Sequence, residues 1–189
     1  RAYALGVNLF AVDCHEEVEK ISRAAPGARV FCRVLTDGEG AEWPLSRKFG
    51  CVPAMAVDVL VYAHQLGLES YGVSFHVGSQ MTKVEAWDAA LSDAKRVFAQ
   101  LAKQGIHLQM VNMGGGFPAN YITRTNELGV YAEEIARFLH EDFGDDLPEI
   151  IIDDGHRLHA DMVAPRRGTT HVTVIVHIAS ESMHHRPPE

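Results

Sequence analysis

Short apolar runs alternate with segments of helical periodicity along most of this chain of 189 residues. Strands that alternate with helices favour a parallel sheet whose neighbouring strands are joined by right-handed crossovers. The runs are almost continuously apolar, which is typical of strands that are covered on both faces. We therefore predict an α/β fold built on a parallel sheet. The predicted strands cover residues 9–12, 28–35, 73–76, 107–113 and 149–152.

Segments of helical period separate these runs. Asp13 stands three residues before Glu16, and Thr82 stands three residues before Glu85, which is the spacing of a capping box at a helix start. Pro53 suits the first turn of another helix. The apolar residues assigned to the four helices are Val18, Ile21 and Ala25; Met55, Val59, Leu60, Ala63 and Leu66; Trp87, Leu91, Ala94, Phe98 and Leu101; and Val130, Ile135, Phe138 and Leu139 within residues 127–143.

Two of the predicted strands end in groups that bind ligands. The fourth runs into three consecutive glycines, residues 114–116, whose lack of Cβ lets the backbone direct N–H groups at an anion. The third ends in His76, with Ser79 three residues later. The carboxyl ends of the strands of a parallel barrel meet on one face, so the two motifs should converge there. The alternatives are a plain turn, a core histidine and a helix-capping serine.

Residues 42–50, 74–80 and 112–118 resemble, in this order, the ornithine/diaminopimelate/arginine decarboxylase family, whose members are fold type III pyridoxal-phosphate enzymes. The resemblance covers residues 1–163, and Phe75 brings it closer to the ornithine branch than to the diaminopimelate branch. It implies a partial (β/α)8 TIM barrel of the alanine racemase-like type. A whole barrel needs about 250 residues, so we expect this one to lack its first strands and the family's C-terminal β domain.

The expected domain organisation follows from the same resemblance. Residues 1–163 should form the partial pyridoxal-phosphate-binding barrel, and residues 164–189 an unmatched, disordered tail. Within this tail, residues 171–178 read as an isolated run of strand type. The abrupt loss of the family pattern suggests the hypothesis of a frameshift or truncation.

The resemblance implies pyridoxal 5'-phosphate as the cofactor. It gives a catalytic role to His76, whose imidazole would stack on the cofactor ring. Ser79 would donate its hydroxyl to the phosphate, while Gly114, Gly115 and chiefly Gly116 would donate backbone N–H groups. The cofactor would act as an electron sink when carbon dioxide leaves the substrate.

Residues 153–156 stand where the family has Glu-Pro-Gly-Arg, and only Gly155 matches. Asp153 would face the pyridine nitrogen with a side chain one methylene shorter than glutamate, so we expect weaker activation of the ring. His156 replaces a phosphate-binding arginine and lacks the guanidinium fork, so affinity for the phosphate should be lower. The resemblance implies that Asp153, Gly155 and His156 all belong to the cofactor site.

The predicted function is that of a decarboxylase fragment that converts L-ornithine to putrescine and carbon dioxide in polyamine biosynthesis. Lysine, diaminopimelate and arginine stay open as substrates. The alternative is a catalytically dead homologue that binds and regulates a decarboxylase. The family's Schiff-base lysine would lie upstream of Arg1, and none of the five lysines here lies in a strand of the expected type, so this chain alone is expected to be inactive. The family's active site is completed across a homodimer interface.

The charge, the apolar runs and the cysteines of the chain indicate which classes of partner and which cellular compartment to expect. A net charge of −8 argues against nucleic-acid binding, and no apolar run approaches the ~18 residues of a membrane span. Cys14, Cys32 and Cys51 show no CxxC spacing, which argues against a disulfide framework and a zinc site and favours a reducing, cytoplasmic setting. The eleven histidines lack ligand spacing, so we expect no metal.

Overall fold

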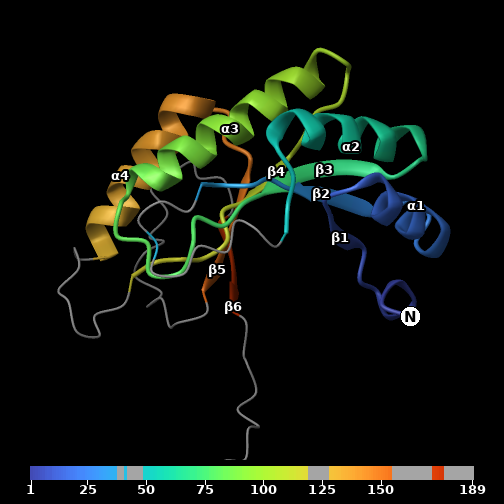
Figure 1. Ribbon diagram of the computed structural model, residues 1–189, viewed down its shortest axis with the longest axis horizontal. Helices are drawn as coiled ribbons and strands as arrows, with labels where there is room; N and C mark the ends of the chain where they lie inside the picture. Colours follow the sequence, from blue (N-terminus) through green and yellow to red (C-terminus); the bar gives the residue numbers. More distant parts are fainter. Residues whose placement is uncertain (38–40, 42–48, 119–127, 155–171, 177–189) are drawn as a thin grey trace, which may run out of the picture.

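The computed structural model describes residues 1–37, 41, 49–118, 128–154 and 172–176. In these ranges six strands form one sheet in the order β1-β2-β3-β4-β5-β6, and every neighbouring pair is parallel (Figure 1). The strands are β1 Leu9–Val12, β2 Arg29–Arg33, β3 Glu69–Ser74, β4 Met110–Asn112, β5 Glu149–Asp154 and β6 Val172–Val176.

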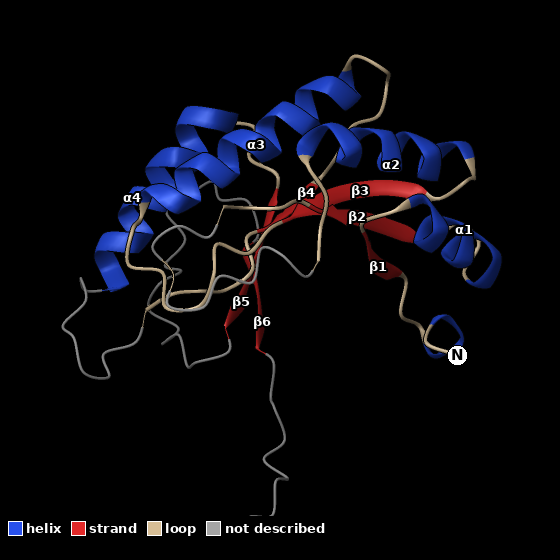
Figure 2. Ribbon diagram, viewed as in Figure 1, coloured by secondary structure: helices blue, strands red, loops and turns tan. Residues whose placement is uncertain are grey.

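The helices lie together along one face of this sheet (Figures 1 and 2). Strand order follows chain order without reversal, so each right-handed crossover leaves its helix on the same side. Consecutive helices consequently pack against one another. This arrangement is part of a (β/α)8 barrel and confirms the predicted fold class. The helices are α1 His15–Ala24, α2 Pro53–Gln65, α3 Glu85–Ala102 and α4 Leu128–Phe143, and a 3-10 turn, Tyr3–Leu5, precedes β1.

The core fills the space between the sheet and this helical layer. On β2, Val30 and Cys32 are buried, whereas the residues that alternate with them are half-buried. The predicted stripe of α3 is confirmed, with Trp87, Leu91 and Leu101 fully buried. The sheet therefore has one face buried under the helices and another left for the inner side of the barrel.

Most of the apolar residues assigned to α2 and α4 are buried, namely Val59, Leu60 and Ala63 on α2 and Ile135, Phe138 and Leu139 on α4. On α4 Val130 is 44% exposed, and the neighbouring Tyr131 takes its place in the core. On α2 the exceptions are Met55 and the C-cap residue Leu66, which are exposed. These exposed residues lie in the first turn or at the end of their helices, and the central part of each predicted stripe is confirmed.

Neither predicted capping box forms. The N-cap of α1 is Cys14 and that of α3 is Val84, and neither helix receives a side-chain cap. The carboxylate of Asp13 instead accepts a hydrogen bond from the backbone N–H of Gly50 at 2.9 Å. The Asp13 carboxylate, which the sequence pattern predicted to cap α1, therefore accepts its hydrogen bond from a residue distant in sequence.

The run predicted to be an isolated strand pairs with the rest of the sheet. β6 lies parallel to β5, with Val172 opposite Ile150 and Val174 opposite Ile152. The prediction of isolation was wrong because a parallel partner is joined through a long crossover, and such a partner is not visible locally in sequence.

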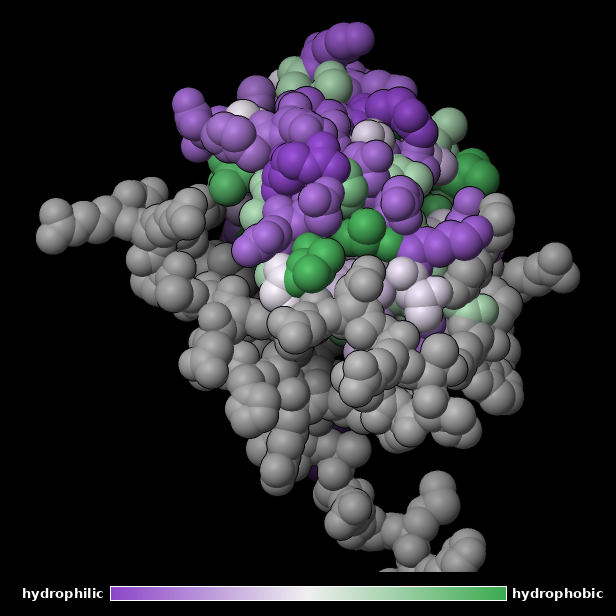
Figure 3. Space-filling view, turned by 90° about the vertical axis from the view of Figure 1, so that its left-hand side faces the viewer, coloured by the Kyte–Doolittle hydropathy of each residue, from purple (hydrophilic) through white to green (hydrophobic). Residues whose placement is uncertain are grey.

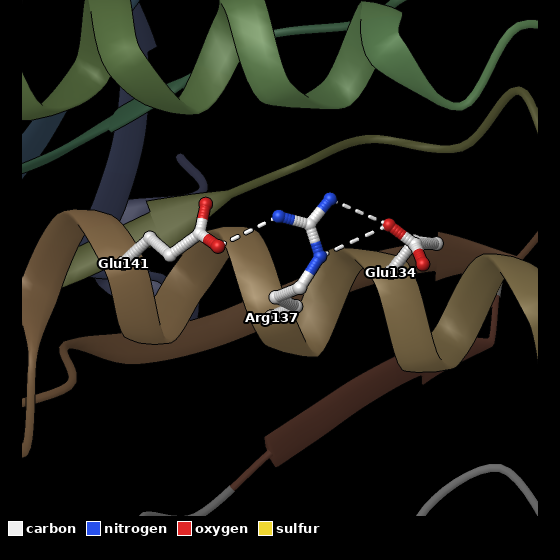
Figure 4. Close-up of polar contacts among 3 residues, drawn as sticks. All are labelled: Glu134, Arg137 and Glu141. Carbon is white, nitrogen blue, oxygen red and sulfur yellow. Dashed lines mark hydrogen bonds and ion pairs between the residues drawn. The ribbon is translucent and has the colours of Figure 1, made fainter.

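The outer surface of the helical layer is polar. Figure 3 shows the side of the molecule that lies at the left of Figure 1, and its described residues are mainly hydrophilic. On α4 the guanidinium of Arg137 lies between the carboxylates of Glu134 and Glu141, with an N–O distance of 2.6 Å to each (Figure 4). Within the described part of the chain, no helix combines the length and apolar character that crossing a bilayer requires.

The burial pattern of α2 is testable with two identical truncations. Replacing fully buried Leu60 by alanine should lower the free energy of unfolding by about 2–5 kcal/mol, because a cavity opens beneath the helix. The same change at Leu66, which is 40% exposed, should cost no more than about 0.5 kcal/mol. Urea unfolding of both variants measures the difference, and equal losses would contradict this orientation of α2.

Candidate functional site

The loops after β3 and β4 meet because these strands are neighbours in the sheet. Ser74 at the end of β3 lies opposite Asn112 at the end of β4. The residues that follow line one cavity of about 520 Å³. The lining from these two loops is Phe75, His76, Ser79, Gln80, Gly114, Gly115, Gly116 and Phe117. The predicted convergence of the two motifs is therefore confirmed.

The imidazole of His76 connects the two loops. Its Nδ1 accepts a hydrogen bond from the backbone N–H of Gly115 at 3.2 Å. Its backbone carbonyl accepts another from the hydroxyl of Thr36 at 2.8 Å, which ties the loop to the segment after β2. Because Nδ1 is an acceptor, the neutral ring carries its proton on Nε2.

The glycine run is packed too closely for side chains. A Cβ on Gly114 would lie 2.6 Å from the carbonyl oxygen of Phe75, and one on Gly116 would lie 2.4 Å from the carbonyl oxygen of Gly78. Both glycines also have positive φ angles, +63° and +103°. The backbone of the glycine loop therefore lies directly against the backbone of the loop after β3, and only glycine permits so close an approach.

The three glycine N–H groups are not equivalent. That of Gly114 donates to the Asn112 side-chain oxygen at 2.7 Å, and that of Gly115 donates to His76. The Gly116 N–H has no acceptor among the residues that the structure describes, although its carbonyl accepts the Met81 N–H at 2.8 Å. Among the described residues, Gly116 is thus the one glycine of the three whose N–H lacks an acceptor.

Ser79 lies in a tight turn between these elements. Gly78 has a φ of +111° and Gln80 a φ of +55°, an uncommon value for a residue with a side chain. The next helix begins only at Glu85, so Ser79 is not a helix cap. Its hydroxyl has no hydrogen-bond partner within the described ranges, and the residue lines the cavity.

The cavity also contains polar residues that the motif analysis missed. Arg33, Ser74 and Asn112 lie opposite one another on three adjacent strands and all line it. They form a polar layer across the inner face of the sheet. The signal in sequence is a polar residue at the last position of each of the three strands, but it gains meaning only when the register is known.

Aromatic packing fixes the glycine loop from behind. Phe117 stacks on Trp87 of α3 with ring centroids 5.1 Å apart and an interplanar angle of 25°. Tyr131 of α4 meets the same indole edge-on at 5.8 Å. Trp87 is fully buried, and its indole N–H has no hydrogen-bond partner among the described residues. The loop is therefore attached to the core through its Phe117 side chain.

The last predicted part of the site is only partly described. The backbone of Asp153 lies in β5, opposite Ile175 of β6, so residue 153 is near the carboxyl end of its strand. Its side chain, Gly155 and His156 lie outside the described residues. Their assignment to the cofactor site remains a prediction.

A second cavity, of about 510 Å³, lies at the opposite end of the sheet. Its lining includes Lys95, His107 and Asp146, where α3 and α4 meet the segments that enter β4 and β5. Barrel enzymes carry their sites at the carboxyl ends of the strands, which favours the first cavity. Nowhere in the described ranges do three or more His, Cys, Asp or Glu side chains gather as a metal site would require.

Comparison with known families identifies the site's chemistry. Residues 1–160 match the family described as pyridoxal-dependent decarboxylase, pyridoxal binding domain. The chain belongs to the pyridoxal-dependent decarboxylases. Its cofactor is therefore pyridoxal phosphate, as predicted. The cavity fits such a group, because the Ser79 hydroxyl, the His76 imidazole and a Gly116 N–H without an acceptor among the described residues all line it.

Individual relatives support this membership. The lysine/ornithine decarboxylase of Selenomonas ruminantium is 38% identical over 112 residues, which cover 59% of this chain and 28% of the relative. The ornithine decarboxylase of Mus musculus is 37% identical over 119 residues, 63% of this chain and 26% of the relative. The antizyme inhibitor 2 of Xenopus laevis is 37% identical over 131 residues, 69% of this chain and 28% of the relative. The chain thus spans about a quarter of the length of these decarboxylase relatives.

A solved decarboxylase structure has the same fold. The crystal structure of SrLDC in complex with PLP and cadaverine superimposes with a TM-score of 0.71 at 32% identity. The match covers 80% of this chain and 37% of that one. The partial barrel of this chain therefore has the same fold as the corresponding part of that decarboxylase.

The close packing at Gly116 is testable against a glycine of the same conformation. Gly105 also has a positive φ, +76°, but no atom lies within 4 Å of the position its Cβ would take. Alanine at residue 105 should lower the free energy of unfolding by about 1–2 kcal/mol, the cost of the left-handed backbone. Alanine at residue 116 should cost about 1–3 kcal/mol more, because it overlaps the Gly78 carbonyl. Equal losses in urea unfolding would contradict the close approach.

Proposed function

We propose that this chain is the cofactor-binding part of an amino-acid decarboxylase that converts L-ornithine to putrescine and carbon dioxide in polyamine biosynthesis. Residues 1–163 form the barrel portion in this proposal. The relatives named as ornithine or lysine/ornithine decarboxylases support a basic amino acid as the substrate. Phe75, beside His76, supports ornithine by resemblance to that branch of the family.

The cofactor phosphate is bound, in this proposal, by the Gly116 N–H and the Ser79 hydroxyl. The observation that carries the proposal is that both donors line the cavity that holds His76, and neither has a partner among the described residues. Gly114 and Gly115 contribute mainly through shape, since their N–H groups bond to Asn112 and His76.

His76 is the proposed catalytic residue that lies against the cofactor ring. Its Nδ1 is engaged by the Gly115 N–H, so the plane of the imidazole is restrained relative to the glycine loop. Such restraint suits a group that must keep a flat ring in one orientation. When bound, pyridoxal phosphate supplies the electron sink for the decarboxylation, and the residues of this chain orient it.

Residues 153–156 are proposed to complete the site with altered chemistry. Asp153 provides the carboxylate for the pyridine nitrogen, and Gly155 and His156 follow at the phosphate. A histidine that is largely neutral at pH 7 attracts the phosphate less than an arginine does. The proposed protein therefore binds its cofactor less tightly than a relative with Glu-Pro-Gly-Arg.

Assembly and location belong to the same proposal. We place the whole protein in the cytoplasm as a homodimer, which is the family's expected arrangement. The three cysteines, Cys14, Cys32 and Cys51, are all free thiols, which is consistent with a reducing compartment.

A regulatory homologue without activity is the second candidate. The 37% identity to the antizyme inhibitor 2 of Xenopus laevis and the altered residues 153–156 favour it. Carboxyl-labelled L-ornithine, L-lysine, L-arginine and diaminopimelate, given separately to the protein that the whole gene encodes, distinguish the two candidates. Release of labelled carbon dioxide from ornithine at the highest rate supports our proposal. Release from none of the four supports the regulatory candidate.

Cofactor binding is testable without catalysis. Pyridoxamine 5'-phosphate and pyridoxamine differ only in the phosphate and cannot form imines with surface lysines. We expect this chain to bind the phosphorylated amine at least about tenfold more tightly in equilibrium dialysis, because a charge-assisted hydrogen bond contributes about 1.5–3 kcal/mol. Ser79→Ala should lower the affinity for pyridoxamine 5'-phosphate about tenfold and leave the affinity for pyridoxamine unchanged.

The control for this experiment is Ser22→Ala. The Ser22 hydroxyl bonds to the Glu19 carbonyl within α1 and is not part of the cavity. Its loss should not change the affinity for either amine. Equal binding of the two amines to the unaltered chain would refute the phosphate site.

The double substitution Asp153→Glu and His156→Arg tests the proposed end of β5. It should raise the affinity for pyridoxamine 5'-phosphate by about tenfold, because an arginine fork binds the phosphate through paired charge-assisted hydrogen bonds. His140→Arg, on the exposed side of α4, adds the same charge and should leave the affinity unchanged. Unchanged affinity in the double variant would contradict the alignment of residues 153–156 with the family's motif.

A further inference from the structure

Two of the three cysteines lie against each other outside the cofactor cavity. Cys32 on β2 is fully buried, Cys51 is 5% exposed, and their Sγ atoms are 3.5 Å apart. Both are free thiols, as is the half-buried Cys14. A contact at this distance requires an approach of about 1.5 Å to reach the length of a disulfide bond, about 2.05 Å.

Backbone pairing holds Cys51 beside the strand that carries Cys32. The Cys51 N–H donates to the Arg33 carbonyl and its own carbonyl accepts the Leu35 N–H, both at 2.9 Å. A parallel bridge joins Cys51 to Val34. The preceding residue, Gly50, is held by the carboxylate of Asp13. The position of the Cys51 sulfur beside that of Cys32 is therefore fixed by backbone hydrogen bonds to the end of β2 and by the bond between Gly50 and Asp13.

The two thiols are chemically unequal. The hydrogen bond from Cys32 lowers the pKa of Cys51, although burial and the Asp13 carboxylate oppose this effect. The hydrogen bond to Cys51, together with burial, raises the pKa of Cys32. Cys51 is also the more exposed of the two. A small oxidant therefore meets the better nucleophile, Cys51, first, and Cys32 stands within reach to resolve the product.

We propose that Cys32 and Cys51 are an oxidative modification site that closes to an intramolecular disulfide in the presence of hydrogen peroxide. The Cys51 thiolate attacks one peroxide oxygen, the O–O bond breaks, and hydroxide leaves with a proton from solvent as water. The sulfur of Cys32 then attacks the Cys51 sulfenic acid. The S–S bond forms, the S–O bond breaks, and the departing hydroxide takes the Cys32 proton as a second water.

The cross-link joins β2 to the residues that lead into α2. The two cysteines are 19 positions apart in sequence, and Arg33 lies between them in the chain. The Arg33 carbonyl lies 3.7 Å from the Cys51 sulfur, and the Arg33 side chain lines the cofactor cavity. The pair lies on the side of the sheet away from that cavity, so its oxidation does not depend on the proposed cofactor function.

The experiment treats the folded chain with a small excess of hydrogen peroxide, then alkylates the remaining thiols and analyses the protein by mass spectrometry. We expect the loss of two hydrogens, one alkylated cysteine, and a peptide cross-link between residues 32 and 51. The same treatment in denaturant should lose this selectivity. Three alkylated cysteines, a bridge that includes Cys14, or sulfinic acid at Cys51 without a bridge would each overturn the proposal.

Single variants test the order of the steps. Cys14→Ser, the matched control, should form the same bridge to the same extent. Cys32→Ala should stop at the sulfenic acid, which dimedone traps on Cys51, whereas Cys51→Ala should give no adduct on Cys32. A dimedone adduct on Cys32 instead would overturn the assignment of Cys51 as the attacking thiol. The cross-link in the unaltered chain decides the main proposal even where a variant does not fold.

Discussion

The parallel pairing of β3 with β4 is the constraint on which the rest of the site depends. Ser74 and Asn112 lie opposite each other where the two strands end, so the loops that follow must occupy the same space. Gly72 permits this pairing, since a Cβ there would lie 2.3 Å from the Met110 carbonyl oxygen. A slip of β4 by one residue in this register would turn Asn112 to the opposite face of the sheet from Arg33 and Ser74.

The loops themselves are irregular, and the core holds them in place. Gly78, Gly114 and Gly116 reach positive φ angles without a side-chain clash, whereas Gln80, with a φ of +55°, carries a conformational cost that tertiary contacts must offset. The stack of Phe117 on Trp87, the bond from the Gly115 N–H to the imidazole and the bond from Met81 to Gly116 supply those contacts. Loops that are held in one arrangement before a ligand binds lose little entropy on binding, which is the advantage of preorganisation.

Long-range contacts account for the predictions that were wrong. Asp13 does not cap α1 because its carboxylate bonds to Gly50, 37 residues away. Tyr131, and not Val130, enters the core because its ring meets Trp87 of the neighbouring helix. β6 was not expected to join the sheet because its partner β5 is distant in sequence. In each case a contact between residues far apart in sequence decided the outcome, although the local sequence pattern had the correct kind of secondary structure.

The sequence by itself determined the alternation of strands and helices, the parallel sheet and the two motifs that meet at the cavity. It could do so because apolar periodicity and glycine conformation are local properties. Only the tertiary structure decided that the N–H groups of Gly114 and Gly115 have acceptors while that of Gly116 has none among the described residues, that Arg33 shares the cavity, and that Cys32 touches Cys51. Those facts depend on strand register and on distances between residues far apart in the chain, which local sequence does not encode.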